Sequence, residues 1–413
     1  MSTFGKHFRV TTYGESHCHS VGCIVDGCPP GMQLAESDIQ PQLTRRRPGQ
    51  SALSTPRDEK DRVEIQSGVE FGVTLGTPIG MRVRNEDQRP ADYGNSTMDA
   101  YPRPSHADYT YMEKYGVKAS SGGGRSSARE TIGRVAAGAV AEKYLRQAHG
   151  VEIVAFTLSV GPEALLAPSA AHPTLSSHPD FLALLDAVDR AAVDASPVRC
   201  PALSDAAAAT GARMAALIAA RRDAADSVGG TVACVVRGAP AGLGEPCFDK
   251  LEAALAHAML SIPAAKGFEI GAGFAGCAGL AGSAANDAFV VDDSADQRTG
   301  GDDRGRSGRR KWSRLRTRTN HSGGVQGGIT NGEHVFFTVA FKPPATIGQA
   351  QRTAGWDGVD GVLAAKGRHD PCVVPRAVPV VEAMAALVIM DAVLAQQARS
   401  AARELLAASE KAV

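Results

Sequence analysis

From Gly5 to about Leu158 the chain alternates short apolar runs with glycine and proline turns. Apolar and polar side chains alternate along Ile79–Arg84, and three of the six residues of Phe8–Tyr13 are β-branched. A period of two is typical of strands with one buried face, so the pattern predicts a strand in each of these segments. The same criteria predict four further strands: Gly22–Val25, Arg62–Ile65, Gly230–Val236 and His334–Phe341.

Longer segments carry the periodicity or composition of helices. Thr131–Arg146 is the clearest, and an alanine-rich composition from Ala164 to Ser227 predicts more helices, joined by a surface connection over residues 168–179. Three other helical segments are expected: Ser37–Leu43 continuing into Thr44–Arg47, Phe248–Leu260, and one or two helices over Pro379–Ala407. Strand-rich halves with helices between them indicate an α+β protein.

Part of the pattern occurs twice in the same order. Cys23–Gly31 resembles Cys234–Gly242, each copy is followed by a helical segment, and Glu64–Gly68 resembles Glu269–Gly273. The repeat indicates an ancient duplication, in which two related halves form one compact unit. Turn chemistry shared by unrelated strand–turn–helix units would give the same pattern and is the alternative.

Composition narrows the class of protein. The 413 residues include 44 basic and 44 acidic side chains, and this zero net charge argues against binding polyanions by bulk charge. We expect no membrane span, because the chain shows no charge-free apolar stretch of about 20 residues, and no signal sequence, because the N-terminus lacks an apolar core. Eight dispersed cysteines are typical of reduced thiols in a cytoplasmic protein.

The segment Asp292–Lys311 differs from the rest of the chain because it has almost no apolar side chains. Such a segment cannot offset its ordering entropy by burial, so we predict a mobile surface insertion. Its arginine and glycine content also suits contact with RNA, which makes an RNA-binding module a competing hypothesis.

The strongest candidate for chemistry is Ser120–Arg134, which contains three consecutive glycines and three arginines. The glycines permit close backbone approach to a ligand, and the first-turn N–H groups of the following helix favour an anion. A capping box over Ser127–Glu130 explains the serine and the glutamate but not the glycines or arginines. Because the Walker A and dinucleotide patterns are missing, the run predicts a phosphate or flavin cradle of another type.

Two histidines are candidate acids. His17 ends a Gly-Glu-Ser-His sequence directly after a predicted strand, and His106 lies in the loop-like segment Arg103–Tyr111. A satisfied structural histidine is the alternative for His17. The neighbours Cys18 and His19 also suggest a metal site. However, Cys18, Cys23 and Cys28 are five residues apart, which does not match the usual zinc spacing.

Three other segments offer anion or ligand contacts. Arg45–Gly49 combines three arginines at a helix end, where guanidinium groups match phosphate and carboxylate, although the helix dipole alone also favours them. Asn320–Gly332 has two Gly-Gly pairs, which suit either a flat ligand or tight turns. Ala365–Cys372 places Arg368 near Asp370, as an anion contact beside a carboxylate base or as a surface turn.

These segments together resemble the chorismate synthase family over essentially the whole chain, from Phe4–His17 to Arg376–Pro379 and the final helix. The N-terminal third is most similar to the fungal and protist branch. The most specific motifs are these: Gly14–His17, Arg45–Gly49, Gly122–Thr131 and Lys366–Pro371.

The resemblance implies a lyase that requires reduced FMN. Its substrate would be 5-enolpyruvylshikimate 3-phosphate, which loses phosphate in a 1,4-anti elimination to give chorismate, with no net consumption of reducing equivalents. In the family, a histidine matching His17 lies near the departing phosphate and one matching His106 protonates the reduced flavin. Asp370 matches the carboxylate linked to flavin N5 during proton removal, and Ser16 and Ser127 match relay hydroxyls.

The resemblance also implies ligand contacts. Its candidate anion contacts are four arginines: Arg46, Arg129, Arg134 and Arg368. Its FMN contacts are Arg125, Ser126, Ser127, Ala264, Gly327, Lys342, Pro343, Pro344, Ala345, Thr346 and Arg368. Ala52 departs from the family, which commonly has Arg or Lys there, so one cationic contact is missing unless Arg57 replaces it.

For the fold, the resemblance implies a β-α-β sandwich with a helical layer between two antiparallel sheets, residues 1–413 forming a single domain and 292–311 an insertion. It further implies a cytoplasmic homotetramer that acts on a small molecule, without nucleic acid, membrane or metal. Fungal-type relatives reduce FMN with NADPH themselves. A bifunctional enzyme with flavin reductase activity is therefore the alternative, which no dinucleotide fingerprint decides.

Overall fold

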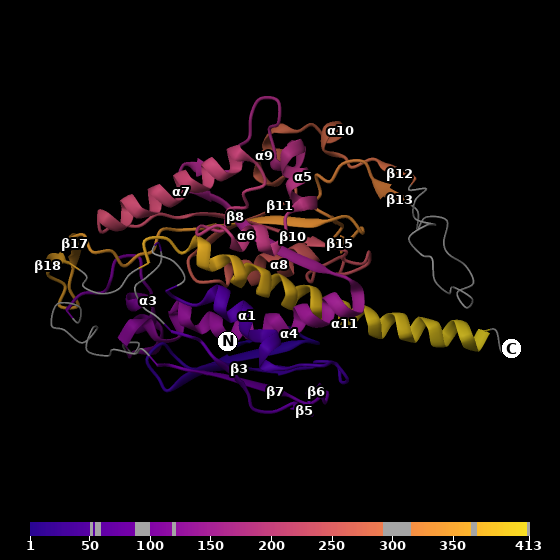
Figure 1. Cartoon of the computed structure of the whole chain (residues 1–413), viewed down its shortest axis with the longest axis horizontal. Coiled ribbons are helices and arrows are strands. Elements are labelled where there is room, and N and C mark those ends of the chain that lie inside the picture. The colour runs from indigo at the N-terminus through magenta and orange to yellow at the C-terminus, as the bar shows by residue number, and fades with distance from the viewer. Residues whose placement is uncertain are drawn as a thin grey trace.

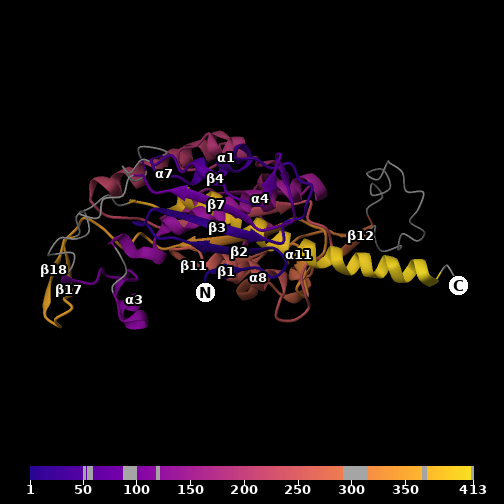
Figure 2. The same cartoon turned by 90° about the horizontal axis from the view of Figure 1, so that it is seen from below.

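The computed structural model describes residues 1–49, 53, 59–86, 100–117, 121–291, 315–364 and 370–410. Two five-stranded antiparallel sheets enclose a layer of helices, which Figure 1 shows from the side and Figure 2 from below. The predicted α+β sandwich is therefore confirmed. In spatial order, the first sheet consists of β1 (Thr3–Phe4), β2 (Arg9–Tyr13), β3 (Ser20–Asp26), β7 (Ile79–Arg84) and β4 (Val63–Ile65). The second consists of β11 (Ala265–Ile270), β16 (Val335–Phe341), β10 (Gly230–Arg237), β8 (Glu152–Val160) and β9 (Glu163–Ala164).

In the described part of the chain four helices form the central layer, and other elements surround the sandwich. The central helices are α1 (Glu36–Arg46), α4 (Thr131–His149), α8 (Leu251–Leu260) and α11 (Val374–Glu410). The peripheral helices are α3 (Asp108–Tyr115), α5 (Pro179–Ala187), α6 (Arg190–Asp194), α7 (Asp205–Asp223), α9 (Gly273–Gly279) and α10 (Gly282–Ala285). Four hairpins pair β5 (Val69–Glu70) with β6 (Val73–Thr74), β12 (Phe289–Val291) with β13 (Leu315–Thr317), β14 (Val325–Gln326) with β15 (Ile329–Thr330), and β17 (Gln351–Ala354) with β18 (Asp360–Leu363).

Burial along the strands follows from what covers each sheet. β7 alternates buried and partly exposed residues, because only one face of the first sheet packs against α4. In β10, by contrast, Val232–Val236 is buried throughout. The second sheet has α11 on one face, whereas α7 lies on the other (Figure 1). The alternating and the continuous apolar patterns thus have different structural causes.

The last helix, α11, is one continuous element of 37 residues. It begins at Val374 and includes Pro379. By length and composition Val374–Leu406 is apolar enough to cross a membrane, although Glu382 and Asp391 interrupt it, so it is not a charge-free stretch. However, 83% of its most apolar window is buried inside the protein, where it packs against α4, α8 and both β8 and β10. Its composition is therefore that of a core helix.

The predicted internal repeat is confirmed by the strand topology. The order β2-β3-β7-β4 of the first sheet corresponds to the order β8-β10-β16-β11 of the second, and all the pairings are antiparallel. In each half a helix follows the second of these strands, α1 after β3 and α8 after β10, and a longer helix, α4 or α11, comes at the end. The four central helices are thus two related pairs.

The repeat extends to individual hydrogen bonds of the turn that follows β3 and β10. Thr74 Oγ1 donates to the carbonyl of Pro29 at 2.8 Å and accepts from the backbone N–H of Met32 at 3.0 Å. In the second half Thr330 makes the same two bonds at 2.7 and 2.8 Å. Both threonines are buried, so each hydroxyl satisfies two groups that water cannot reach.

Replacing Thr330 with valine is expected to lower the free energy of unfolding by about 1–3 kcal/mol, because a buried carbonyl and a buried N–H each lose their partner. Urea unfolding followed by circular dichroism measures the change. The exposed Thr77 makes no such bond, and Thr77→Val should change stability by less than about 0.5 kcal/mol. Equal effects of the two substitutions would show that the repeated turn does not depend on this hydroxyl.

Candidate active site

A cavity of about 650 Å³ lies where the two halves of the repeat meet. The C-terminal ends of α1 and α8 reach it through Arg46 and Leu260, and the starts of α4 and α11 reach it through Thr131 and Val373. Equivalent parts of both halves therefore build one site. Two long helices begin at this cavity, and their free N–H groups and dipoles favour an anion there.

The charged side chains around the cavity are mostly positive. Among the described residues its lining contains four cations and one carboxylate: Arg46, Lys266, Lys342, Arg376 and Asp370. Lys342 is held in place because its Nζ donates to the carbonyl of Ser105 at 2.7 Å. This local excess of positive charge in a chain of zero net charge indicates a small polyanionic ligand.

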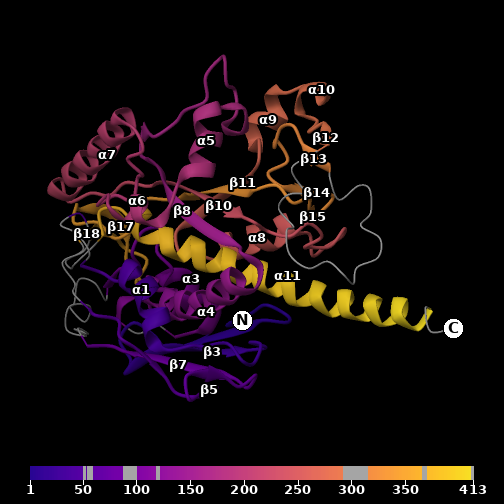
Figure 3. The ribbon, with the colours of Figure 1, turned by 45° about the vertical axis from the view of Figure 1, so that its right-hand side comes forward.

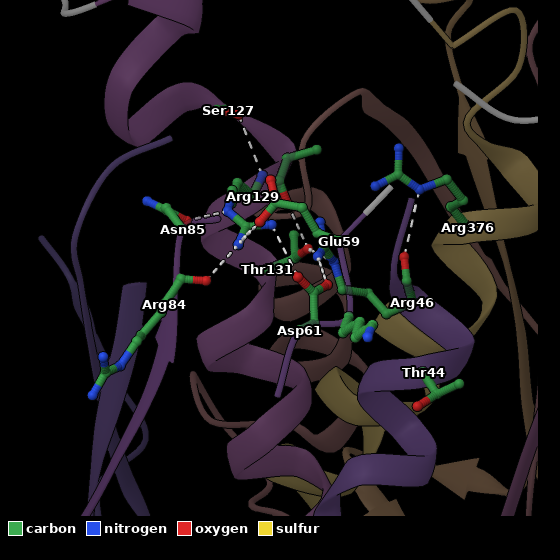
Figure 4. A network of polar contacts seen from close by, with 12 residues as sticks. Thr44, Arg46, Glu59, Asp61, Arg84, Asn85, Ser127, Arg129, Thr131 and Arg376 are labelled. Atoms are coloured by element: carbon green, nitrogen blue, oxygen red, sulfur yellow. Dashed lines mark hydrogen bonds and ion pairs between the residues drawn. The ribbon is translucent and has the colours of Figure 1, made fainter. Parts of the chain in front are cut away.

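Arg46 is the most deeply buried of these cations. Its guanidinium donates to Asp61 Oδ2 at 2.8 Å, to Thr131 Oγ1 at 3.1 Å and to the carbonyl of Ala128 at 3.2 Å, as Figure 4 shows. Burial lowers the pKa of Arg46 to about 10, with Asp61 opposing the shift, so the side chain remains cationic at neutral pH. The network fixes the guanidinium in one orientation at the wall of the cavity.

Arg129 lies behind Arg46 and does not line the cavity. It shares Asp61 through a 3.0 Å contact to Oδ1, forms an ion pair with Glu59, and donates to Asn85 (Figure 4). The backbone N–H of Arg129 also donates to Ser127 Oγ at 3.3 Å, which caps the turn before α4. The predicted cap is therefore present at the serine. As placed here, Arg129 holds Asp61 and thereby supports Arg46.

Two further arginines of the glycine-rich segment connect neighbouring elements by hydrogen bonds. Arg125 donates to the carbonyl of Gly14 at 2.8 Å and to Thr12 Oγ1 at 2.6 Å, which ties the segment to the end of β2. Arg134 pairs with Glu130 at 2.9 Å and donates to Ser261 Oγ at 2.6 Å, which joins α4 to the end of α8. Neither lines the cavity, so their ligand contacts stay predictions.

The three adjacent arginines that end α1 do not form one clamp. Arg46 faces the cavity, whereas Arg45 points to the other side of the helix, where it forms ion pairs with Glu382 and Asp194. The carbonyl of Arg45 accepts a 2.7 Å hydrogen bond from Arg199, so an arginine caps the helix end as well. The anion-clamp interpretation therefore stays a prediction for Arg46, which lines the cavity, and does not suit Arg45.

His106 and Asp370 both line the cavity, as expected for an acid and a base that act on one ligand. The segment Arg103–Tyr111 is not wholly a loop, because α3 begins at Asp108. His106 precedes this helix and is one fifth exposed. Asp370 forms an ion pair with Arg376, whose Nε donates to the carbonyl of Arg46 at 3.4 Å. The carboxylate is thus linked to the end of α1.

His17 and Ser16 lie in the turn between β2 and β3. Ser16 is buried, and its Oγ lies 2.9 Å from His17 Nδ1. Asn85 holds the turn, because its side-chain amide donates to the carbonyl of Glu15 at 3.0 Å. Neither residue is among those that line the cavity, so their catalytic roles stay predictions.

Eight of the predicted site residues line the cavity: Arg46, His106, Ser126, Ala264, Lys342, Pro344, Ala345 and Asp370. The other described ones lie outside its lining: Ser16, His17, Arg125, Ser127, Arg129, Arg134, Gly327, Pro343 and Thr346. Arg368, Ala52 and Arg57 lie outside the described residues, as does the insertion at 292–311. Within the described ranges, no three histidine, cysteine or acidic side chains are placed to hold a metal ion.

Sequence reasoning missed Lys266, Arg376 and Asp61. Arg376 stood in a motif that carries the family resemblance, and Lys266 follows a predicted ligand position closely, so both had a signal nearby. No motif in the sequence pointed to Asp61, because its two arginine partners are distant in the sequence and come from α1 and from the turn before α4.

The fold and the cavity together indicate an enzyme whose small-molecule site is rich in cations and contains a histidine and a carboxylate. The protein-family model described as chorismate synthase matches residues 8–394. The chorismate synthase of Neurospora crassa is 68% identical over 98% of this chain and 93% of its own length, and that of Saccharomyces cerevisiae is 61% identical over 98% and 100%. A crystal structure of chorismate synthase superposes with a TM-score of 0.67 at 28% identity, over 95% of this chain and 93% of the other. The chain therefore belongs to the chorismate synthase family and is a lyase.

Gly123, in the 3₁₀ turn Ser121–Ser126, allows the ring of His106 to pack closely. Its φ is +96°, and an added Cβ would lie 3.0 Å from His106 Cε1 and 3.2 Å from Ser126 Oγ. Gly123→Ala should therefore displace the histidine and lower kcat for chorismate formation by about 10²-fold. The matched control is Gly116→Ala, because Gly116 also has a positive φ (+68°) but its added Cβ would meet no atom within 4 Å. Similar activity in both variants would contradict this role.

Proposed function

We propose that this chain eliminates phosphate from 5-enolpyruvylshikimate 3-phosphate to give chorismate, with reduced FMN bound and no net oxidation or reduction. The observation that carries the proposal is the composition of the cavity, in which four cations and the starts of two long helices face one volume shared with His106 and Asp370. The substrate has a phosphate and two carboxylates, so it requires such an excess of positive charge.

The residues around the cavity also fit a flavin. Leu260, Ile262 and Pro263 offer an apolar wall for a flat ring, and the cations and helix starts suit a phosphate. Ala264 has a φ of +69°, a conformation that non-glycine residues adopt rarely and that often marks ligand sites. When bound, reduced FMN would supply transient electron density that eases cleavage of the carbon–oxygen bond.

The chain's own residues bind the substrate and handle its protons. Arg46 and Arg376 would bind anionic groups of the substrate. Asp370 would accept the proton that leaves carbon, and His106 would hold a proton at the nitrogen that faces the cavity. His17, from the turn after β2, would protonate the departing phosphate. Ser16 and Ser127 would act as relay hydroxyls beside these groups, and Arg368 as a further anion contact.

Anaerobic turnover with chemically reduced FMN tests the proposal, with chorismate followed by its absorbance and phosphate measured separately. Equal amounts of both products support it, and folded protein that gives neither would refute it. The same assay with oxidised FMN and NADPH decides between the monofunctional and the bifunctional enzyme. Chorismate formed with NADPH alone would show that the chain reduces its own flavin.

We also propose a homotetramer of single-domain chains in the cytoplasm. The last part of α11 extends beyond the body of the protein (Figure 3), and Leu405 and Leu406 are 74% and 67% exposed there, which suits contact with another copy. All eight cysteines are unpaired, which suits a reducing compartment. Sedimentation equilibrium would give the mass of the assembly. A monomer at micromolar concentration would contradict this part of the proposal.

A further inference from the structure

A mostly buried carboxylate that does not line the cavity, that of Asp108, holds His106. Asp108 Oδ1 accepts a 2.9 Å hydrogen bond from His106 Nδ1. Arg103 binds the same carboxylate twice, with Nε donating to Oδ2 at 2.7 Å and Nη2 donating to Oδ1 at 2.8 Å. The side chains of Arg103 and Asp108 are only 10% and 12% exposed, so water competes little with these bonds. Three side chains therefore form one connected unit.

Asp108 acts as an acceptor in this unit because it is ionised. Burial alone would raise the pKa of Asp108, but the hydrogen bonds from Arg103 and then from His106 outweigh that effect and hold the pKa well below its ordinary value. An ionised carboxylate has no proton to donate. The hydrogen on the shared bond must therefore belong to His106 Nδ1 in both protonation states of the ring.

The other ring nitrogen of His106, Nε2, is available to a ligand in the cavity. Within the described part of the chain no hydrogen bond engages His106 Nε2, and the ring lines the cavity. The ring lies against Gly123, and Ser126 Oγ and His106 Nε2 lie 3.2 and 3.5 Å from the position of a Cβ at that glycine. Nε2 is thus the nitrogen that exchanges a proton, and its bond to hydrogen distinguishes the acid from the neutral ring.

We propose that Arg103 and Asp108 are positioning residues for His106, fixing the orientation of its ring and holding a proton on Nδ1, so that the doubly protonated ring donates its Nε2–H proton. The inference rests on the proposed function for the donor role of His106. In the step, the Nε2–H bond breaks, its electron pair stays on nitrogen, and the proton goes to a bound ligand atom. The ring is left neutral with its remaining proton on Nδ1, and Asp108 does not become protonated.

The other charged groups at this cavity are mostly cations, which oppose a positive ring. From the end of β16, Lys342 reaches Ser105, beside the histidine; across the cavity are Arg46 from α1, Lys266 from β11, and Arg376 with Asp370 at the start of α11. Asp108 is the carboxylate in hydrogen-bond contact with His106, whereas Asp370 pairs with Arg376. A dedicated carboxylate is what a protonated ring requires in such surroundings.

The tautomer of His106 gives a direct test, read by ¹⁵N NMR of histidine-labelled enzyme without FMN or substrate, with the signal assigned by its loss in His106→Gln. At a pH where the ring is neutral, the wild-type protein should show Nδ1 protonated and Nε2 bare. Asp108→Asn should reverse this. Arg103 Nε and the Arg103 backbone N–H both donate to Oδ2, so the amide oxygen stays there and the NH₂ group faces Nδ1.

The same variant should lower kcat by about 10²-fold or more with little change in KM, because an asparagine NH₂ group facing Nδ1 opposes the doubly protonated ring that donates from Nε2. The matched control is Asp186→Asn, which alters a 2.9 Å contact to His334 that is exposed and away from the cavity, and which should leave kcat unchanged. Asp108→Glu keeps the charge and should retain more activity than Asp108→Asn.

If the neutral ring of His106 in the wild-type protein carries its proton on Nε2, the proposal is wrong, and this result needs no variant to fold. A folded Asp108→Asn enzyme with normal kcat would also overturn it. Failure of the proposed function is distinguishable, because it would appear as a wild-type protein that makes no chorismate while the tautomer of His106 still reverses in Asp108→Asn.

Discussion

Asp370→Asn is expected to reduce kcat for chorismate formation by about 10²–10⁴-fold, the usual contribution of a positioned base. Asparagine keeps the shape of the side chain but accepts no proton at neutral pH. It also removes the negative charge that pairs with Arg376, so the cavity becomes more positive. We therefore expect substrate binding to persist or tighten while turnover is lost, and single-turnover assays with reduced FMN would separate the two effects.

A matched variant shows whether the loss is specific. Asp360 is exposed on β18 and does not line the cavity, so Asp360→Asn should keep wild-type kcat. Circular dichroism and FMN titration should show both variants folded and able to bind the flavin. If Asp370→Asn retains more than about a tenth of wild-type kcat, Asp370 is not the base.

Glu382→Ala is expected to lower the free energy of unfolding by about 3–5 kcal/mol, since it removes one partner from a buried ionic cluster. Glu382 is 2% exposed on α11. It accepts hydrogen bonds from Arg45 and from the backbone N–H of Ala155 at 3.0 Å, and it forms an ion pair with Arg190 at 3.2 Å. Without the carboxylate, two guanidinium groups keep their desolvation cost and lose their main partner. Urea unfolding at neutral pH measures the difference.

The control for this variant is an exposed ion pair. Glu152, 53% exposed, pairs with Arg237 at 2.8 Å, and Glu152→Ala should cost less than about 1 kcal/mol. The double variant Arg45→Leu/Glu382→Leu should recover part of the loss, because removing both charges also removes their desolvation cost. A cost below about 1 kcal/mol for Glu382→Ala would show that water reaches the cluster.

The contribution of Glu382 should also depend on pH. Burial raises its pKa, but the charges of Arg45 and Arg190 outweigh burial, and the net shift is below the ordinary value of 4.5. A carboxyl with a depressed pKa stabilises the fold fully above that ordinary value, and the stabilisation is lost as the pH falls through the lower folded-state pKa. The difference between wild type and Glu382→Gln should therefore be largest at neutral pH and shrink in acid.

Local patterns predicted the elements that are regular over their own length. The alternation in Ile79–Arg84 and the periodicity of Thr131–Arg146 each correspond to an element of the structure, β7 and α4. The residues repeated in the two turns indicated the duplication, whereas the distant threonines that hold each turn, Thr74 and Thr330, could not be predicted. By contrast, Arg103–Tyr111 appeared loop-like although α3 begins within it. Glu152–Val160 and Ala265–Ile270 are strands that we did not single out, and their pairing with distant strands defines them.

Site residues that lie within sequence motifs could be predicted. Contacts between residues that are distant in the sequence could not. His106 and Asp370 come from separate segments yet line one cavity, as the resemblance implied. The sequence could not show which arginine lines the cavity and which forms ion pairs elsewhere. The side that Arg45 or Arg46 faces depends on Glu382 of α11 and on Asp61. Adjacent residues of one type looked equivalent in the sequence and have different partners in the fold.

The most direct test of the central claim is a crystal structure of the enzyme with FMN and 5-enolpyruvylshikimate 3-phosphate bound. We expect both molecules in the cavity between His106 and Asp370, with the phosphate and carboxylates on Arg46 and Arg376 and with His17 at the leaving phosphate. Ligands bound elsewhere, such as in the polar groove lined by Asp38, Glu142 and Arg190, or found far from His106 and Asp370, would contradict it.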